Sequence, residues 1–318
     1  MTTVSSGQAI GMVGVGRMGL SICARLVQQG FGVVATDVRP DARAAVVAAG
    51  GDWAGSVVQV AAHAEVVISV LPGPLEVCAI CEQLPAALSS GSTWIDMSTA
   101  TPAVAAEIAR SAAVHHVRTL EAPVGGGPAE AREGQLLAFV GGSAEDLRAQ
   151  RGVLDALTDR VLHVGAAGSG YAMKLLVNLL WFGQAIANAE VLSLAVRAGI
   201  DPETVRYAVQ QSAAASRFME QDAPALMRGE NLTSFSLARC VEELSGVLNM
   251  GREHDVPLAL GERVTEIYIE ALKHFGDVDG ELLAARRVTE QARIEFGTSG
   301  ADPHSLATAP AVTPAPSV

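Results

Sequence analysis

The sequence predicts an α/β domain on a doubly wound, mostly parallel sheet, followed by an all-α domain that a long helix joins to it. Two observations support this prediction: short apolar runs alternate with helical stretches up to about residue 165, and strand patterns are missing beyond it. Alternation of this kind is typical of parallel sheets that helices cover on both faces. We therefore expect a first domain at residues 1–167, a helical domain at 168–297 and a disordered tail, rich in Pro, Ala, Ser and Thr, at 298–318.

Composition and charge disfavour several classes of protein. The 318 residues are enough for about two domains, and a net charge of −12 disfavours nucleic acid as a partner. The four cysteines are too few for a disulfide framework, and the CxxC of Cys78 and Cys81 lacks the second pair of a zinc site. The first residues lack the cationic start of a secretory signal, and no uninterrupted apolar run reaches the ~18 residues of a membrane span. We expect a soluble cytoplasmic protein with no metal ion, nucleic acid or membrane as partner.

The first element is a strand that ends in a glycine-rich turn. The apolar run 9–15 leads into the sequence GVGRMG, after which a helical pattern continues to Gly30. In such a turn Gly14 permits the tight bend, Gly16 lets the backbone approach a pyrophosphate, and Gly19 lets the helix pack closely on the strand. The helix N-terminus then faces the anion. The pattern predicts a dinucleotide-binding βαβ unit.

A second strand, at residues 31–35, ends next to Asp37, which lies 18 residues after Gly19. A carboxylate at this strand tip can accept hydrogen bonds from an adenosine ribose and would repel a 2′-phosphate, so NAD is expected. Arg39, two residues further on, could instead reach a 2′-phosphate and keeps NADP possible. A chance glycine turn with a surface aspartate is the weaker interpretation, because the whole strand–turn–helix–strand context is present.

Three further strand ends carry polar or glycine-rich segments. The run 66–71 ends at Pro72, the run 93–96 ends in DMSTATP, and the run 119–124 leads into GGGP. Ligands of open α/β sheets bind at the carboxyl ends of the strands, so these segments are candidate binding loops. The last strands are expected at residues 136–140 and 161–164.

A long helical stretch between Gly165 and Gly199 starts the second domain. Lys174, Asn178 and Trp181 recur on one face, and nearly all other positions are apolar, which predicts burial where two domains or two subunits meet. A buried lysine and amide cost free energy unless they are paired. They could serve a reaction, or Lys174 could extend to water while Asn178 caps a loop. We interpret Trp181 as a core residue rather than a pocket residue.

Further helices are expected beyond this stretch. Asp201 and Pro202 form a typical helix start, and residues 235–251 and 257–275 have helical patterns.

Four ordered segments resemble the signatures of the β-hydroxyacid dehydrogenases, the family of 3-hydroxyisobutyrate dehydrogenase and tartronate semialdehyde reductase. These segments are GVGRMG at 14–19, DMSTATP at 96–102, EAPVGGG at 121–127 and GSGYAMKLLVN at 168–178. The resemblance covers residues 9–296 and implies a Rossmann domain, a helical domain and an active site in the cleft. It implies NAD(P)-dependent interconversion of a small 3-hydroxy acid and its aldehyde or keto acid, and subunits that pair as a homodimer or homotetramer.

The resemblance also implies roles for individual residues. Lys174 matches the catalytic lysine and Asn178 the residue that orients the substrate. Burial lowers the pKa of a lysine from its ordinary ~10.4 toward neutrality, where it can accept or donate a proton. The implied cofactor contacts are Gly14, Gly16, Arg17, Met18, Gly19, Asp37, Leu71, Pro72 and Thr99. The implied substrate contacts are Ser98, Gly125, Gly126, Gly127 and Asn178.

Two positions depart from the family pattern. Gly125 stands where the family usually has serine, and Glu242-Glu243 stands where it has Lys-Asp. Glu242 would repel an anion that the lysine normally attracts, so a reductase of another polar carbonyl or imine, such as a sulfonated aldehyde, stays open. Glu242 and Glu243 could also be a solvated helix face with Arg239 as partner. A non-catalytic cofactor-binding scaffold is the third reading, but it has no need of Lys174.

Overall fold

The computed structural model describes residues 9–296, which fall into two compact units. The α/β unit holds the residues up to Leu180 together with Glu242–Gly261, and the helical unit holds Trp181–Val241 and the residues from Glu262 on. This division crosses the long helix, whereas the sequence placed the domain boundary at 167/168. The predicted disordered tail lies outside the described residues.

The α/β unit is built on one sheet of nine strands among the described residues. The strands are β1 (Ala9–Val13), β2 (Gly32–Thr36), β3 (Asp52–Trp53), β4 (Val66–Ser69), β5 (Thr93–Asp96), β6 (Arg118–Glu121), β7 (Val124–Gly125), β8 (Leu136–Gly142) and β9 (Thr158–Gly165). Their order is β3-β2-β1-β4-β5-β6-β8-β7, with β9 paired to β8. Only the pairs of β8 with β6 and β7 are antiparallel. The predicted doubly wound, mostly parallel sheet is confirmed.

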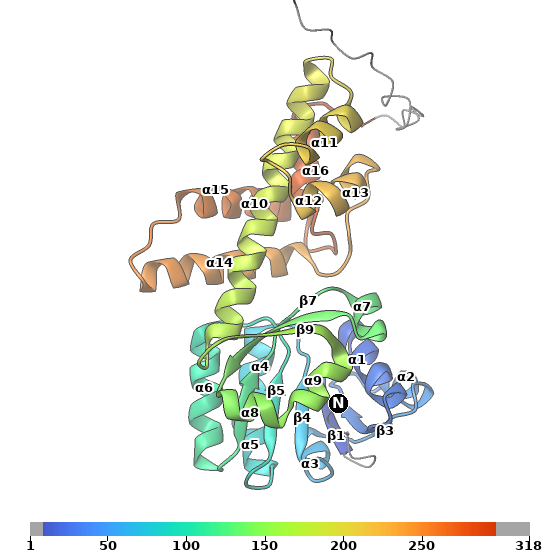
Figure 1. Cartoon of the computed structure of the whole chain (residues 1–318), viewed down its shortest axis with the longest axis vertical. Helices are drawn as coiled ribbons and strands as arrows, with labels where there is room; N and C mark the ends of the chain where they lie inside the picture. Colours follow the sequence, from blue (N-terminus) through green and yellow to red (C-terminus); the bar gives the residue numbers. More distant parts are fainter. Residues whose placement is uncertain (1–8, 297–318) are drawn as a thin grey trace, which may run out of the picture. The chain divides into compact units, whose positions relative to one another are not determined.

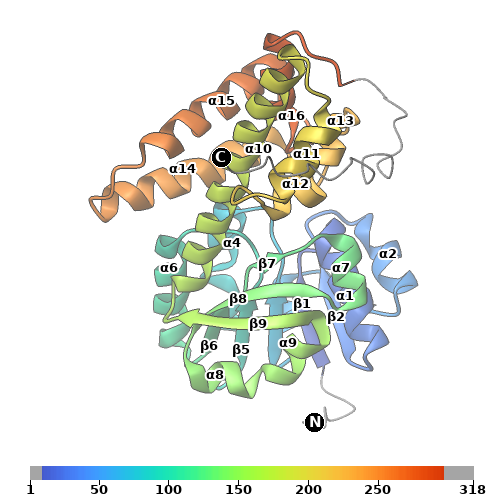
Figure 2. The ribbon, with the colours of Figure 1, turned by 45° about the horizontal axis from the view of Figure 1, so that its top comes forward.

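Helices cover both faces of this sheet (Figure 1, Figure 2). They are α1 (Arg17–Gln28), α2 (Ala42–Ala48), α3 (Val57–Ala61), α4 (Pro74–Ile80), α5 (Gln83–Ala87), α6 (Pro102–Val114), α7 (Pro128–Glu133), α8 (Ala144–Ala149) and α9 (Arg151–Leu157). Successive strand residues point to opposite faces, so Val66 and Ile68 of β4 enter one core cluster and Val67 enters the other. Burial on both faces explains why these strands read as continuous apolar runs.

One strand was predicted incorrectly. The run 119–124 forms two short strands, β6 and β7, with Ala122 and Pro123 between them. Proline has no N–H to continue a ladder, so β6 stops and β7 pairs with β8 on its own.

The carboxyl ends of the parallel strands form a level edge. Val13 of β1 pairs with Thr36 of β2 and with Ser69 of β4, Ser69 pairs with Asp96 of β5, and Asp96 pairs with Glu121 of β6. The loops that follow these strands therefore start side by side, which places the predicted binding segments along one edge of the sheet.

The second half of the described chain is helical, as predicted. Its helices are α10 (Ser169–Arg197), α11 (Pro202–Gln210), α12 (Arg217–Gln221), α13 (Ala223–Met227), α14 (Leu237–Glu253), α15 (Ala259–Phe275) and α16 (Leu283–Gln291). Asp201 caps α11 by accepting a hydrogen bond from the Thr204 N–H, as its position before Pro202 predicts. The core of the helical unit contains Phe182, whose ring meets that of Tyr268 at a centroid distance of 4.9 Å.

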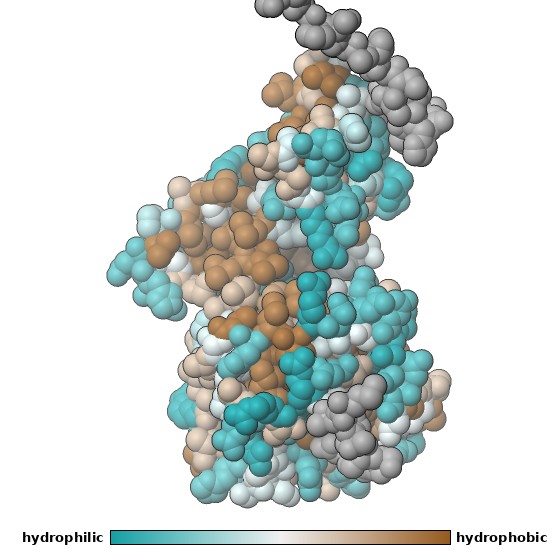
Figure 3. Space-filling model, viewed as in Figure 1, coloured by the Kyte–Doolittle hydropathy of each residue, from teal (hydrophilic) through white to brown (hydrophobic). Residues whose placement is uncertain are grey.

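The long helix α10 is less buried than its apolar sequence predicts. Its first half packs in the α/β unit through Tyr171 and its second half in the helical unit through Leu192, both fully buried. A stripe of large hydrophobic side chains is nevertheless exposed on it: Leu176, Val177, Leu180, Val191 and Leu194. Figure 3 shows that hydrophobic residues also reach the surface of the face in view. Packing within the chain therefore buries only part of this helix, and burial of the exposed face between subunits stays a prediction.

By length and composition α10 would also suffice to cross a membrane, although the sequence contains no uninterrupted apolar run of that length. The two findings differ because a mean hydropathy over 18 residues tolerates isolated polar residues. Core helices of globular proteins pass the same test, and α10 packs into two cores as such helices do.

A pair of glycine substitutions tests the first turn. A Cβ atom on Gly19 would lie 2.1 Å from the Gly14 carbonyl oxygen, whereas a Cβ on Gly16 would meet no atom within 4 Å. We expect Gly19→Ala to lower the free energy of unfolding by about 2 to 3 kcal/mol. Gly16→Ala should change it by only about 0.5 kcal/mol. Urea unfolding of both variants measures the difference, and equal midpoints would contradict this account of the turn.

Candidate active site

The glycine turn forms a cradle open on one side. Gly14 has φ +88°, and a Cβ there would lie 2.4 Å from the Val70 carbonyl oxygen, so only glycine fits. Gly16 is the N-cap of the twelve-residue helix α1 and supplies no side chain to cap it, and the space beside it is open. An open helix N-terminus next to free space suits a pyrophosphate, so these residues fit a dinucleotide. Arg17 is exposed at the same helix start, and Met18 packs against the core.

Asp37 is joined to this cradle by hydrogen bonds. Its carboxylate accepts from the Val15 N–H at 2.8 Å and from the Arg39 N–H at 2.9 Å, and it pairs with the Arg39 guanidinium at 3.2 Å. Burial acts to raise the pKa of Asp37, but the two N–H groups and Arg39 outweigh it and the net pKa is lowered. The structure thus brings together the acid that suits NAD and the cation that could suit NADP, already paired with each other.

The loops after β4 and β5 carry the next predicted contacts. Leu71 and Thr99 are half-buried and Pro72 is exposed, so all three reach the surface at the sheet edge. Ser98 does not, because only 3% of it is exposed. Its hydroxyl accepts a hydrogen bond from the Leu71 N–H at 2.9 Å and donates one to Asp96 at 3.1 Å. The Ser98 hydroxyl thus links the loop that begins at Leu71 to Asp96, and the substrate contact expected of this residue stays a prediction.

The loop Gly125 to Gly127 joins β7 to α7. A Cβ on Gly125 would have its nearest neighbour at 3.8 Å, so packing does not require glycine there. Gly126 has φ +106°, which favours glycine. The Gly127 N–H donates to the Glu130 carboxylate at 2.8 Å, so a group that was expected to hold the substrate's acid already has an anionic partner.

Lys174 and Asn178 face a carboxylate from α14. The Asn178 amide donates to Glu243 at 2.5 Å, and Glu243 is half-buried rather than on a solvated face. Burial lowers the pKa of Lys174, while the negative charge of Glu243 acts to raise it. The alternative in which Asn178 caps a loop does not hold, since its partner is a side chain. Sequence reasoning missed this contact, because the two residues are 65 positions apart.

A buried acidic pair beneath these residues was also missed. Asp96 and Glu121 end adjacent strands and are 1% and 5% exposed. Asp96 accepts a hydrogen bond from the Tyr171 hydroxyl at 2.8 Å, and Glu121 accepts from the Gly168 N–H at 2.5 Å. The available signal was a carboxylate at the end of each buried strand, since buried acids are rare unless they are paired.

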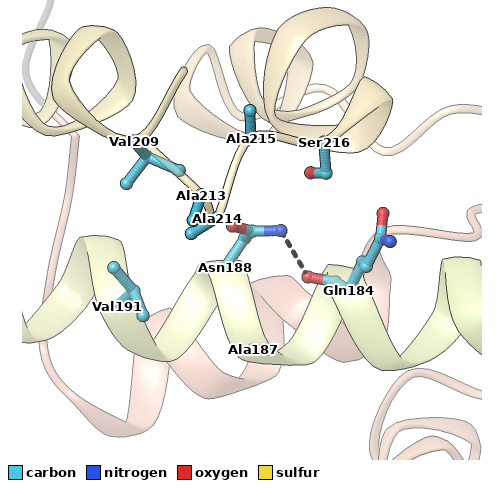
Figure 4. A pocket seen from close by; sticks show the side chains of 9 residues that line it. All are labelled: Gln184, Ala187, Asn188, Val191, Val209, Ala213, Ala214, Ala215 and Ser216. Carbon is cyan, nitrogen blue, oxygen red and sulfur yellow. Dashed lines mark hydrogen bonds between the residues drawn. The ribbon is translucent and has the colours of Figure 1, made fainter. Parts of the chain in front are cut away.

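Trp181 belongs to the helical unit, where it is half-buried and packs against the core cluster. Its indole N–H donates to Asp222 at 2.8 Å, and its ring packs edge-on against Phe218. A hollow of about 350 Å³ lies further along α10 (Figure 4). Its walls are Gln184, Ala187, Asn188, Val191, Val209, Ala213, Ala214, Ala215 and Ser216. These residues include no charged group and no predicted site residue, so this hollow is separate from the candidate active site.

The side chains of residues 9–296 support neither a metal site nor a reactive thiol. No group of three or more His, Cys, Asp or Glu in this part of the chain could hold a metal ion. Cys78 and Cys81 are free thiols, and burial raises the pKa of both, to about 12 for Cys81. Thiols of this kind are poor nucleophiles at neutral pH, which agrees with a packing role.

Comparisons with known proteins cover nearly all of the described chain. Residues 9–165 match the family described as the NAD binding domain of 6-phosphogluconate dehydrogenase. Residues 168–287 match the family described as NAD-binding of NADP-dependent 3-hydroxyisobutyrate dehydrogenase.

Individual relatives match over almost their whole length. The chain is 30% identical to 2-(hydroxymethyl)glutarate dehydrogenase of Eubacterium barkeri, over 89% of this chain and 95% of that protein. It is 29% identical to L-threonate dehydrogenase of Cupriavidus necator, over 86% of this chain and 94% of that protein. The structure of Mycobacterium tuberculosis 3-hydroxyisobutyrate dehydrogenase with L-serine is similar to this one, with a TM-score of 0.82 and 28% sequence identity. The similarity covers 90% of this chain and 99% of that chain.

The electrostatics of Lys174 can be measured directly because the sequence has only two lysines, Lys174 and the exposed Lys273. After reductive ¹³C-methylation, NMR titration should give Lys174 a pKa below the ordinary ~10.4 of a lysine. Glu243→Gln removes the charge that raises the pKa of Lys174 and should lower it further. The matched variant Glu253→Gln, on an exposed position of the same helix, should leave it unchanged. An unshifted Lys174 signal in Glu243→Gln would refute the coupling.

Proposed function

Because the chain belongs to the β-hydroxyacid dehydrogenase family, we propose that it interconverts a small 3-hydroxy acid and the corresponding aldehyde or keto acid, with Lys174 as general acid/base. As a member of that family it is an NAD(P)-dependent hydroxyacid dehydrogenase. The observation that supports the finer assignment is Lys174 itself, a lysine with a lowered pKa held next to Asn178 and Glu243.

The proton chemistry follows from the surroundings of Lys174. In alcohol oxidation, neutral Lys174 accepts the hydroxyl proton; in carbonyl reduction, protonated Lys174 returns it to the oxygen. Burial favours the neutral form of Lys174, and the negative charge of Glu243 favours its protonated form. Asn178, one turn further along α10, orients the substrate oxygen.

A nicotinamide cofactor, when bound, would supply the hydride chemistry of this reaction. Gly14, Gly16 and Gly19 with the first turn of α1 would hold its pyrophosphate, because the cradle is open there. Leu71 and Thr99 would contact it along the sheet edge. We favour NAD over NADP, because the lowered pKa keeps Asp37 negatively charged and Arg39 is already paired with it.

The exposed stripe of α10 supports an assembly of several subunits. Leu180 and Leu194 are 67% and 72% exposed, and large hydrophobic side chains at such spacing favour association. We propose a homodimer or homotetramer in the cytoplasm whose ligand is a small hydroxy acid or aldehyde acid, with no nucleic-acid or membrane partner.

A different polar carbonyl or an imine is the second candidate substrate. Gly125 has no hydroxyl for a carboxylate, and Glu130 already occupies the Gly127 N–H. Both observations weaken the anchoring of a small carboxylic acid and favour another head group.

Turnover of a substrate panel tests the proposed function. Initial rates with NAD and NADP are measured for carboxylic, sulfonated and amino-bearing hydroxy compounds. Lys174→Ala should lower kcat for the best substrate by about 10²-fold or more, while the cofactor Kd changes less than about twofold. Lys273→Ala is the matched control and should retain full activity. Cofactor binding without turnover of any compound would favour the scaffold reading, and an active Lys174→Ala would refute the role of this lysine.

Cofactor choice is tested separately at Asp37. Asp37→Ala removes the charge that repels a 2′-phosphate and releases Arg39, so the affinity for NADPH relative to NADH should rise by about tenfold. Asp52→Ala makes the same charge change at an exposed position of β3 and should leave the ratio unchanged. Fluorescence titration of both reduced cofactors gives the ratio. If Asp37→Ala weakened the binding of NADH and of NADPH equally, this residue would not select between the two cofactors.

A further inference from the structure

The Asp96 carboxyl group is the centre of a buried hydrogen-bond network. It accepts hydrogen bonds from the Ser69 hydroxyl, from the Tyr171 hydroxyl at 2.8 Å, and from both the N–H and the hydroxyl of Ser98 at 2.9 and 3.1 Å. Burial raises the pKa of Asp96, although each of these bonds acts to lower it. A buried acid with four donors around it has a fixed position and orientation.

The directions of these bonds follow from groups that can only donate. The Trp94 indole N–H donates to the Ser69 hydroxyl oxygen at 2.7 Å, and the Leu71 N–H donates to the Ser98 hydroxyl oxygen at 2.9 Å. Each hydroxyl therefore has its own hydrogen left for Asp96. Asp96 is the common acceptor of the network, and the loop that begins at Leu71 is tied to it through Ser98.

The start of α10 is held by both buried acids. Glu121 accepts the Gly168 and Gly170 N–H groups at 2.5 and 3.1 Å, and a negative charge is favourable at a helix N-terminus. A Cβ on Gly170 would lie 2.8 Å from the Phe139 carbonyl oxygen, so the helix begins in direct contact with β8. Asp96 holds the same turn through the fully buried Tyr171.

Lys174 lies three residues after Tyr171, which is roughly 4.5 Å along the helix axis. A rotation or shift of this turn therefore moves Lys174 directly. Asp96 is thus joined on one side to the predicted cofactor loops and on the other to the helix that carries the proposed acid/base.

We propose that Asp96, acting through Tyr171, is the positioning residue that fixes Lys174 relative to the cofactor loops. The proposal rests on the proposed role of Lys174. Neither Asp96 nor Tyr171 is exposed, so neither touches the substrate, and their effect reaches the reaction through alignment. Proton and hydride transfer require the reacting groups to be aligned, and small displacements of such groups cost large factors in rate.

A matched pair of tyrosines isolates this effect. Tyr171 and Tyr268 are both 0% exposed, and the Tyr268 hydroxyl donates to the Glu281 carbonyl oxygen at 3.0 Å inside the helical unit. Tyr171→Phe and Tyr268→Phe each remove one buried hydroxyl and should lower the Tm by similar amounts. Only Tyr171→Phe should lower kcat, by about tenfold, with the substrate KM and the cofactor Kd within about twofold of the original values.

A double-variant cycle tests whether the effect acts through Lys174. In the Lys174→Ala background, adding Tyr171→Phe should leave the residual rate unchanged within about twofold, because the group to be aligned is gone. A tenfold loss that persists in this background, or an unchanged kcat in the single Tyr171→Phe variant, would overturn the proposal while the function stands. A fully active Lys174→Ala would overturn the proposed function, and the positioning role with it.

A second variant keeps the test valid if Tyr171→Phe does not fold. Glu121→Gln keeps the shape of the side chain but leaves one oxygen instead of two to accept the Gly168 and Gly170 N–H groups. It should produce the same lowering of kcat at constant cofactor Kd. An unchanged kcat in this variant would contradict the role of the first turn of α10.

Discussion

The burial of the Asp96 carboxyl group is the constraint on which the rest of the site depends. A carboxyl group this deep is costly unless it is hydrogen-bonded, and the chain supplies donors from β4, from the loop after β5 and from α10. The hydrogen bonds to the Asp96 carboxyl group thus hold these three segments in place relative to one another. The register of the parallel strands makes this possible, because Ser69, Asp96 and Glu121 stand in one row at the end of the sheet.

The two faces of α10 show how one helix can serve packing and chemistry. Tyr171 and Leu175 are buried in the α/β unit, whereas Lys174 is only partly covered and its pKa is lowered by burial. Asn178 and Glu243 are hydrogen-bonded to each other on that side, and the negative charge of Glu243 offsets part of the cost of burying the Lys174 amine.

Most of the fold could be predicted from local patterns, but the site only in part. Short stretches of sequence are enough to predict the glycine turn, the strands and α10. Each of these is recognised from the spacing of glycine or apolar residues close together in the chain. The split at Pro123 was missed because an apolar run does not reveal where a ladder stops. The Asn178–Glu243 contact and the inward direction of Ser98 depend on long-range packing, which no local pattern encodes. The resemblance located Lys174 and Asn178, and the structure added what surrounds them.

The residues that differ from the family pattern lie outside the buried network, and this separation bears on how such an enzyme can diversify. Gly125 has no neighbour closer than 3.8 Å to an added Cβ, so single substitutions there are sterically tolerated. Asp96, in contrast, could be replaced only by simultaneous changes in all the groups that donate to it. A change at Gly125 can therefore leave the hydrogen-bond network around Asp96 intact, whereas Glu243 acts directly on Asn178 and Lys174.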